Sequence, residues 1–382
     1  MVRRWQAKAS PTAPLIGVHM HHLGISVYPE HSTPEADEAY LKLASEHGFD
    51  RLFTCLLSVK KSREDTLNEF GKFVKKAHSY GFSVAVDTNP TVFKHLGATA
   101  SDLRPFAQMN VDIIRLDGHL GDFGDIVATQ NPYGIAIQFN ASSNLALDLL
   151  IERGADSRNM CVCHNFYPER YTGLGEGRFK ELSKKYHDMG LPTAAFISSR
   201  QPNTFGPWDV FDGLPTCEED RTRPIDLQAR HLLATGLVDN VLVGNCFASE
   251  EELTRLASLD LTRTTMRVSL EPAATKAEID ELWMFDHFTR TDASDYLLRS
   301  SLPRLRYREV SIPSHNLGSQ QIRRGDVLIV NDNLEHYRGE VEVALRDFPD
   351  DGTRNIVARI PKEEQFLLDY IKPEHRFGFI KP

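Results

Sequence analysis

"LGISVYPEHSTPEADEAYLKLASEHG", residues 23–48, decides the fold, because it joins a strand pattern to a helix pattern. Its first six residues are a short apolar run, which is typical of a buried strand. Ser32 stands three residues before Glu35, as in a capping box, and Pro34 falls in the first turn. Gly48 supplies a helix stop. The stretch therefore predicts one strand followed by one helix.

This strand–helix unit repeats along the first two-thirds of the chain. Further strands are predicted at residues 51–57, 82–87, 111–117, 134–140, 160–165, 193–199 and 240–245. Helical patterns separate them, and a last one covers 249–257. Eight such units in about 240 residues fit a (β/α)₈ barrel, whose usual size is ~250 residues. A doubly wound sheet is the alternative, but no glycine-rich dinucleotide fingerprint follows any strand, so the barrel is predicted.

The pattern changes beyond residue 260. Short alternating strands are predicted at 305–312, 325–332 and 339–347, separated by turn residues. These features are typical of a small antiparallel β-barrel or sandwich. The predicted organisation is an N-terminal tail at 1–14, a TIM-barrel domain at 15–260 and an all-β domain at 261–382.

Composition excludes several classes of partner. The chain has 382 residues, 41% of them hydrophobic, and a net charge of −9 with scattered basic residues. A nucleic-acid partner would leave a basic footprint, and none is present. No run of eighteen apolar residues and no signal-peptide core is found, so no membrane partner is expected. Five widely spread cysteines predict a reducing cytoplasm without disulfides. The oligomeric state stays open, a homo-oligomer included.

Functional residues of a (β/α)₈ barrel lie in the loops after its strands. Polar side chains follow five of the predicted strands: Glu30, Asp87, Asp117, Asn140, and the pair His164 and Asn165. The loop at 200–224 is the longest of the barrel half and holds Trp208, Glu218 and Arg221. A loop of this length in a compact domain is usually functional.

Carboxylates, amides and arginines therefore gather at the predicted barrel mouth. Paired carboxylates perform acid–base or nucleophilic work, as in glycoside hydrolysis, and arginines bind phosphate or carboxylate. Structural alternatives stand beside these readings. Asp87 suits a helix cap, Asp117 a turn, Glu218 a solvated loop face, and His164 a satisfied core histidine.

Other chemistries are poorly supported. No lysine ends a barrel strand, which weakens a Schiff-base mechanism, and neither GxSxG nor HExxH occurs. His19, His21 and His22 resemble a metal-binding tract, but they precede the first strand, at the wrong face of the barrel. No metal and no organic cofactor is predicted.

Longer motifs carry a resemblance to a known family. They are "LGISVYPEHST", "FTCLLSV", "LGATASDL", "IRLDGH", "NPYGIAIQFNAS", "HNFYPERYTGL", "GPWDVFDGLPTCEEDR", "ATGLVDNVLVGNCFASEEEL", "RRGDVLIVN" and "YRGEVEVAL". The chain resembles the bacterial 6-phospho-N-acetylmuramidases of the MupG type from about residue 22 onward. That family was formerly of unknown function and was named as outer surface protein.

The resemblance implies a TIM barrel followed by a cyclophilin-like β-barrel domain. It implies a cytoplasmic enzyme of peptidoglycan recycling that needs no cofactor. Its substrate would be the disaccharide in which N-acetylmuramic acid 6-phosphate is linked β-1,4 to N-acetylglucosamine.

The resemblance also suggests roles for residues of the mouth. Glu30, Asp87, Asp117 and Glu218 fall on its acidic positions, with Asp87 and Asp117 preferred as the catalytic pair. The expected substrate-binding residues are Asn140, His164, Asn165, Tyr167, Arg115, Arg170 and Arg221. Arg115 lies inside its strand and must point inward to qualify. The sequence departs from the family pattern at Gln138, where a carboxylate is expected, and at Asp220, where a histidine is expected.

Two other functions remain as alternatives. A metal-assisted TIM-barrel hydrolase or isomerase would use Asp87, Asp117 and His164 as ligands. A non-catalytic phosphosugar-binding protein would need the same pocket without turnover.

Overall fold

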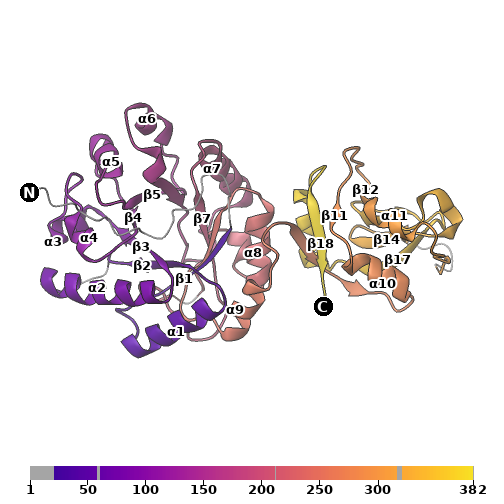
Figure 1. Ribbon diagram of the computed structural model, residues 1–382, viewed down its shortest axis with the longest axis horizontal. Coiled ribbons are helices and arrows are strands. Elements are labelled where there is room, and N and C mark those ends of the chain that lie inside the picture. The colour runs from indigo at the N-terminus through magenta and orange to yellow at the C-terminus, as the bar shows by residue number, and fades with distance from the viewer. Residues whose placement is uncertain (1–20, 58–60, 211, 316–320, 382) are drawn as a thin grey trace, which may run out of the picture.

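Figure 1 shows the chain as a computed structural model, which describes residues 21–57, 61–210, 212–315 and 321–381. The predicted tail at 1–14 lies outside the described residues. Eight parallel strands close into a barrel in chain order, which confirms the predicted (β/α)₈ fold. They are β1 (His22–Ser26), β2 (Arg51–Cys55), β3 (Ser83–Thr88), β4 (Ile113–Leu116), β5 (Ala136–Asn140), β6 (Met160–Cys163), β7 (Thr193–Ile197) and β8 (Asn240–Val243).

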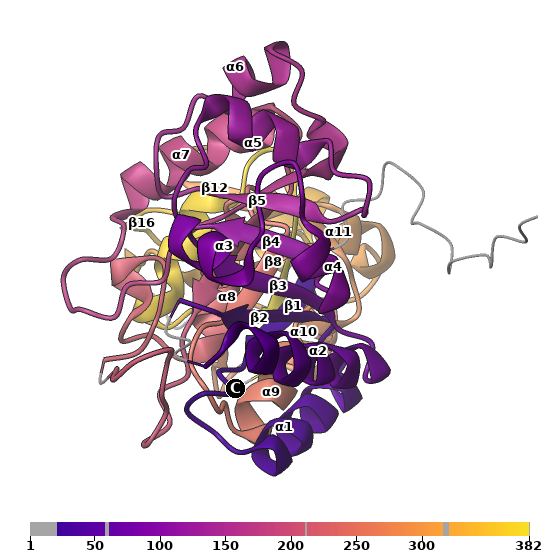
Figure 2. The same cartoon turned by 90° about the vertical axis from the view of Figure 1, so that its left-hand side faces the viewer.

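Helices follow the strands and surround the barrel, as Figure 2 shows with the barrel end of the molecule facing the viewer. They are α1 (Pro34–Glu46), α2 (Arg63–Ser79), α3 (Pro90–Leu96), α4 (Arg104–Gln108), α5 (Asp122–Thr129), α6 (Leu147–Glu152), α7 (Glu176–Asp188), α8 (Ile225–Ala234) and α9 (Glu250–Ala257). Their apolar faces pack on the outside of the strands and form the main hydrophobic core. No helix in the described part of the chain has the length and apolarity needed to cross a bilayer.

The first helix shows how local sequence sets an element's ends. Thr33, not Ser32, is the N-cap of α1, and its hydroxyl accepts a hydrogen bond from the first turn. Ser32 instead donates to Asp37 at 2.5 Å, so the predicted capping box with Glu35 is wrong. The predicted stop is confirmed, because Gly48 adopts a left-handed φ of +81°, which a glycine reaches without strain.

The C-terminal part carries the remaining strands in separate small sheets. Its helices are α10 (Lys276–Trp283) and α11 (Leu302–Tyr307), and its strands are β9 (Thr264–Arg267), β10 (Ser269–Leu270), β11 (His287–Phe288), β12 (Leu297–Ser300), β13 (Gln321–Ile322), β14 (Asp326–Val330), β15 (Val341–Ala344), β16 (Phe348–Pro349), β17 (Arg354–Arg359) and β18 (Arg376–Ile380). A five-stranded antiparallel sheet runs in the order β10-β17-β14-β15-β12. A second sheet runs β11-β18-β9, with β18 parallel to β9, and β13 pairs with β16.

Two of the three predicted C-terminal strands are confirmed as β14 and β15. The third, predicted at 305–312, is wrong, because α11 occupies its first half. The residues just before it explain the difference. Ser301 is the N-cap of α11, and Pro303 lies in its first turn. The N–H that proline lacks would have no partner within the helix at this position, so the proline does not weaken it.

The two parts of the molecule meet along α8, which Figure 1 shows between the barrel and the C-terminal strands. The Arg230 guanidinium of α8 donates to both carboxylate oxygens of Glu364, at 2.5 Å and 2.7 Å. Glu364 belongs to the 3₁₀ segment η4 (Lys362–Tyr370). Because both charges are buried and bonded to each other, separating the parts would leave two uncompensated charges.

Candidate active site

The site begins with the alternation of side chains along β3 and β4. Successive residues of a strand point to opposite faces, so every second residue faces the barrel interior. Asp87 and Arg115 are register partners on these neighbouring strands and face inward together. The requirement that Arg115 point inward is therefore met. Asp117 follows two residues later, above the end of β4.

Arg115 holds this part of the mouth together. One terminal nitrogen, Nη1, donates to Oδ1 of Asp87 at 2.5 Å and to Oδ1 of Asp117 at 3.4 Å. The other, Nη2, donates to the side-chain oxygen of Asn165. The single buried guanidinium of Arg115, on β4, thus joins three other residues, which lie on β3, in the loop after β4 and in the loop after β6. We call Asp87, Arg115, Asp117 and Asn165 the central cluster.

The two carboxylates of the central cluster differ in environment. Asp87 is almost fully buried, and burial raises the pKa of its carboxyl, although the Arg115 guanidinium offsets part of that rise. Burial is the largest single influence on the pKa of Arg115 and would lower it, but the Asp87 carboxylate, together with Cys163 and Asp117, keeps that pKa above its usual value. Asp117 leaves 41% of its side chain exposed to solvent. Different environments are what separates an acid from an ionised partner in a carboxylate pair.

Buried polar atoms without partners lie beside this cluster. Among the described residues, Nε of Arg115 and Oε1 of Gln138 have no hydrogen-bond partner. Gln138 is the register partner of Arg115 on β5. Each buried polar atom without a partner destabilises the folded protein by about 1–3 kcal/mol. Proteins tend to retain such atoms at functional sites. Gln138, which stands where the family resemblance implies a carboxylate, therefore belongs to the floor of the mouth.

His164 does not line the mouth, contrary to the expectation that it binds substrate. Its side chain is fully buried, with Nε2 2.9 Å from the Ser183 hydroxyl on α7 and Nδ1 3.3 Å from the Ser142 hydroxyl. Its ring also packs against Phe179, and burial lowers its pKa to about 3. The alternative of a satisfied core histidine is the one that the structure supports. Adjacent Asn165 points the other way, toward Arg115.

Asn140 and Tyr167 lie at the end of β5 and in the loop after β6. Asn140 ends β5, is half-buried, and accepts a hydrogen bond from the Ser142 backbone. Tyr167 is half-buried, and its backbone N–H donates to the Pro215 carbonyl. Both positions leave side-chain atoms partly open to solvent.

A second group of charged residues lies at the rim of the mouth. We call it the rim cluster, and its members are Arg170, Asp212, Glu218 and Arg221. Arg221 donates to both oxygens of Glu218, at 2.8 Å and 2.7 Å, and also to the carbonyls of Asp212 and Glu169. Arg170 lies on the surface and pairs with Asp212 at 2.7 Å. The rim cluster joins the loop after β6 to the loop after β7.

Glu218 holds a loop in place. Its oxygens also accept the backbone N–H groups of Tyr171 and Gly173, both at 2.8 Å. The Arg221 guanidinium, helped by these N–H groups, lowers the pKa of Glu218 to about 2. A carboxylate with this pKa is ionised at neutral pH, so the expectation that Glu218 serves as a catalytic acid is not supported. Arg221 is likewise fully engaged.

A polar cavity of about 390 Å³ opens over the rim cluster. Its lining includes Arg170, Arg200 and Arg221, with Ser198 and Ser199 from the end of β7. Arginines and hydroxyls are the groups that bind phosphate and sugar oxygens. The cavity thus has the chemistry expected of an anionic sugar site.

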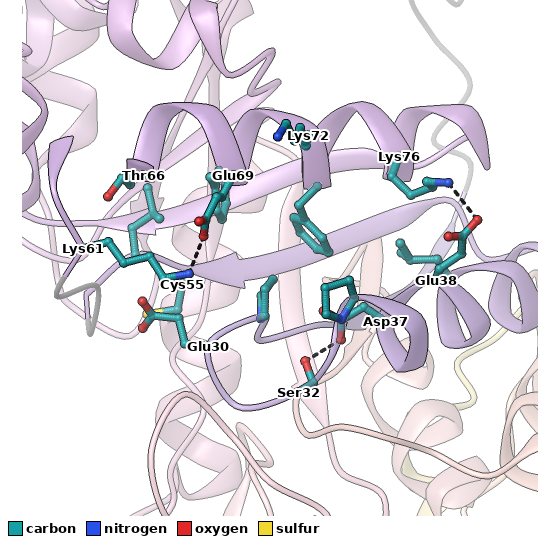
Figure 3. A pocket seen from close by; sticks show the side chains of 16 residues that line it. Glu30, Ser32, Asp37, Glu38, Cys55, Lys61, Thr66, Glu69, Lys72 and Lys76 are labelled. Carbon is teal, nitrogen blue, oxygen red and sulfur yellow. Dashed lines mark hydrogen bonds and ion pairs between the residues drawn. The ribbon is translucent and has the colours of Figure 1, made fainter. Parts of the chain in front are cut away.

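Glu30 lies elsewhere, in a groove of about 580 Å³ between α1 and α2. Figure 3 shows Glu30 in this groove with Lys61, which is bonded to Glu69. Lys76 pairs with Glu38 at the other end. The lining of this groove also includes Cys55, the register partner of Asp87 on β2.

The predicted metal-ligand alternatives are not assembled. His164 faces α7, so Asp87, Asp117 and His164 do not converge. His19 lies outside the described residues, while His21 and His22 bind a backbone carbonyl and Asp50. Over the described ranges, no group of three or more His, Cys, Asp or Glu side chains is placed to hold a metal ion.

An aromatic column was missing from the predicted site residues. Phe53 and Phe196 fill the barrel interior with ring centroids 5.0 Å apart, and Phe166 packs on Phe196 at 5.2 Å. Trp208 lies on Phe166 at 6.0 Å and remains 44% exposed. Phe166 follows Asn165 directly, so the column ends beside the central cluster. The aromatic content of the loop at 200–224 was the sequence signal for it.

Comparison with known proteins matches this chain to a family. The 6-phospho-N-acetylmuramidase N-terminal model matches residues 23–258, and the C-terminal model matches residues 264–380. A search of curated proteins gave no match.

Two solved structures share the whole architecture. An uncharacterized B. cereus protein has 40% sequence identity and a TM-score of 0.86, with 94% of this chain and 99% of that chain covered. A conserved Enterococcus faecalis protein of unknown function has 26% identity and a TM-score of 0.67, with 94% and 96% covered. With both halves of the chain matched by its models, the protein belongs to the 6-phospho-N-acetylmuramidase family of glycosidases.

Proposed function

We propose that this chain cleaves the β-1,4 bond between N-acetylmuramic acid 6-phosphate and N-acetylglucosamine. The observation that carries the proposal is the central cluster, in which one arginine holds two carboxylates at the mouth of a barrel whose family is a glycosidase family. The substrate supplies the anionic and acetamido groups that the arginines and asparagines of the mouth can bind.

The spacing of the carboxylates supports a mechanism that retains configuration. Asp87 and Asp117 bind the same nitrogen, at 2.5 Å and 3.4 Å, so the two bonded oxygens lie within about 6 Å of each other. Retaining enzymes hold their carboxyl groups ~5–5.5 Å apart, whereas inverting enzymes need ~6.5–9.5 Å for a water molecule. Proton NMR of the N-acetylmuramic acid 6-phosphate as it first forms tests this proposal, because an α product would show inversion.

We assign the nucleophile to Asp117 and the proton donor to Asp87. Asp117 is the exposed member, so its carboxylate can approach the sugar and attack it. Asp87 rests as the carboxylate partner of Arg115, but burial raises its pKa, which favours uptake of the proton that an acid must donate. An Asp117→Ala enzyme rescued by azide should give a glycosyl azide of inverted configuration. A retained azide would exchange the two roles.

Binding of the substrate is divided between the two clusters. We infer that Asn165, Asn140 and Tyr167 contact the amino sugar. We assign the 6-phosphate to Arg170, since its guanidinium lies on the surface beside the rim cavity. Trp208 offers an exposed ring on which a sugar can stack. No step of this mechanism uses a metal or cofactor, so activity should survive exhaustive chelation.

The direct test offers the purified protein the phosphorylated disaccharide and its unphosphorylated counterpart, with mass spectrometry of the products. Cleavage of the phosphorylated form supports the proposal, and a preference for it makes Arg170 the next residue to vary. Binding without cleavage of either form would favour a phosphosugar-binding protein.

The remaining proposals concern place and architecture. A role in cytoplasmic peptidoglycan recycling is tested by cell fractionation and by accumulation of the disaccharide when the gene is deleted. The division at residues 260 and 261, with a cyclophilin-like second domain, is tested by limited proteolysis, which should cut between α9 and β9.

A further inference from the structure

Tyr370 links the C-terminal domain to the barrel through its hydroxyl. The hydroxyl donates to Oε1 of Glu176, at the start of α7, at 2.7 Å. Nε2 of His231 on α8 lies 3.1 Å from the same oxygen. Tyr370 is the last residue of η4, so one side chain from beyond residue 260 contacts two barrel helices.

His231 extends this contact to a fully buried carboxylate. Its Nδ1 lies 2.9 Å from both oxygens of Asp220. Nη1 of Arg223 donates to the same carboxylate at 2.8 Å, and the Arg223 guanidinium lies 3.9 Å from the centre of the Phe366 ring, again in η4. Asp220, where the family resemblance implied a histidine, is therefore held by partners that rest on the C-terminal domain.

Asp220 lies in the loop that forms the rim of the mouth. It ends the short helix η2 (Glu218–Asp220), which carries Glu218 and is followed by Arg221. The same loop hydrogen-bonds to the loop after β6 through Leu174 and Cys217, which form a parallel bridge. The Thr216 hydroxyl then donates to the Asn165 carbonyl at 2.9 Å.

A continuous path of contacts thus runs from η4 to the central cluster. Tyr370 contacts His231, and Phe366 contacts Arg223. His231 and Arg223 both bind Asp220, which lies in the rim loop. The rim loop in turn binds Asn165, which is bonded to Arg115. The Arg230–Glu364 pair binds α8 to η4 without touching either loop of the mouth.

We propose that the C-terminal domain positions the substrate-binding loops of the barrel, with Tyr370 and Asp220 as its positioning residues. The kinetic part of this inference rests on the proposed function, whereas the structural part does not. Loss of the path loosens residues 165–175 and 212–223, which bind the sugar, and leaves the inward carboxyl of Asp87 in place. Substrate affinity therefore suffers more than turnover.

Hydrogen exchange of the full-length protein provides the first test. Tyr370→Phe removes only the hydroxyl, and should speed amide exchange in peptides 165–175 and 212–223 by at least fivefold, with strands β14 and β17 unchanged. Glu364→Gln is the matched control, because it weakens the same interface away from the path. Unchanged exchange in both loops, or equal acceleration by the control, would overturn the proposal.

Kinetics on the phosphorylated disaccharide provide the second test. Tyr370→Phe should raise KM about fivefold while kcat stays within twofold. Adding Asp220→Asn should raise KM little beyond the larger single effect, because both changes cut one path; fully multiplicative effects would argue against it. Absence of cleavage by the wild type would reject the proposed function alone, since the exchange measurement needs no substrate.

Discussion

Nη1 of Arg115 lies 2.5 Å from Oδ1 of Asp87, and both side chains are almost fully buried. A buried ion pair contributes little net stability when intact, but removing one partner typically costs about 3–5 kcal/mol. The pair therefore makes Asp87 both a structural and a chemical residue. Asp117, bonded to the same nitrogen but exposed, does not share this double role.

Asp117→Asn should abolish turnover and spare the fold. We expect kcat to fall by a factor of about 10³, within the range for loss of a catalytic carboxylate, and the melting temperature to change by less than about 2 °C. Asp122→Asn, on the exposed surface of α5, is the control and should keep wild-type activity. A variant at position 117 with wild-type kcat would exclude Asp117 from the chemistry.

Asp87→Asn should lose activity and stability together. The amide cannot neutralise the Arg115 guanidinium, so the free energy of unfolding should fall by about 2–4 kcal/mol. Urea denaturation measures this change. If the double variant Asp87→Asn with Arg115→Met regains stability but not activity, the two roles of Asp87 are separated. Equal recovery of both properties would show that Asp87 acts only as a structural partner.

Trp208→Ala should weaken binding of the disaccharide. Loss of a stacked sugar ring should raise KM about tenfold, equivalent to about 1.4 kcal/mol, with little change in kcat. Titration with N-acetylglucosamine should alter the tryptophan fluorescence of the wild type and of Trp283→Phe, but not of Trp208→Phe. A signal that persists in Trp208→Phe would place the sugar elsewhere.

Glu218→Gln should show a pH-dependent loss of stability. The pKa of Glu218 is about 2 in the folded protein, so its contribution is present above the ordinary value of about 4.5 and is lost as the pH falls toward 2. We expect the variant to be less stable by about 1–2 kcal/mol at pH 7, and roughly half of that difference to remain at pH 3. Thermal melts at both values measure this, with exposed Glu219→Gln as the control.

Glu281→Gln should stabilise the protein at alkaline pH. Glu281 is fully buried on α10, and neither of its oxygens has a partner among the described residues. Burial, helped by nearby Glu278, raises its pKa to about 9. Because the pKa of Glu281 is higher in the folded than in the unfolded protein, the free energy of unfolding of the wild type falls as the pH rises from about 4.5 to about 9. The fall is up to about 1.4 kcal/mol per pH unit.

The Glu281→Gln variant lacks this slope. It should therefore match the wild type near pH 5 and exceed it at pH 8. Asp280→Asn, on the same helix but less buried, should follow the wild type at both values. A wild-type slope retained by Glu281→Gln would assign the titration to another group.

Periodicity predicted the barrel well because each of its units is locally encoded. A short apolar run followed by a helical pattern recurs eight times, and each instance needs only neighbouring residues. Four of the helices, α1, α2, α3 and α9, also begin at a residue whose side chain caps them. The ends of elements are less predictable. Ser32 and Thr33 are equally good caps by residue type, but the Ser32 hydroxyl bonds to the side chain of Asp37, and Thr33 is the N-cap.

The central cluster was predicted in its composition but not in its organisation. Asp87 and Asp117 were named as a pair, yet nothing local indicates that Arg115 would lie between them. His164 and Asn165 show the opposite case. Adjacent residues at a strand end face opposite sides, so that alternation, applied strictly, allows only one of them to reach the mouth.

Long-range partners explain most of the remaining differences. Glu218 was expected to act on substrate, but it is bonded to backbone groups 45 and 47 residues away in sequence, at Gly173 and Tyr171. Glu30 was expected on an acidic position of the barrel mouth, and it lies in the groove between α1 and α2. Pairings over such separations leave no periodic signal.

The parallel pairing of β18 with β9 constrains the order in which parts of the protein fold during synthesis. All eight barrel strands have been made once residue 243 is complete, so the barrel can close while later residues are still being added. The sheet β11-β18-β9 cannot form until residues 376–380 appear, because β18 is its middle strand. Until then β9 and β11 present unpaired edges, the kind of surface that chaperones bind. Synthesis therefore yields a closed barrel first, and its partner domain last.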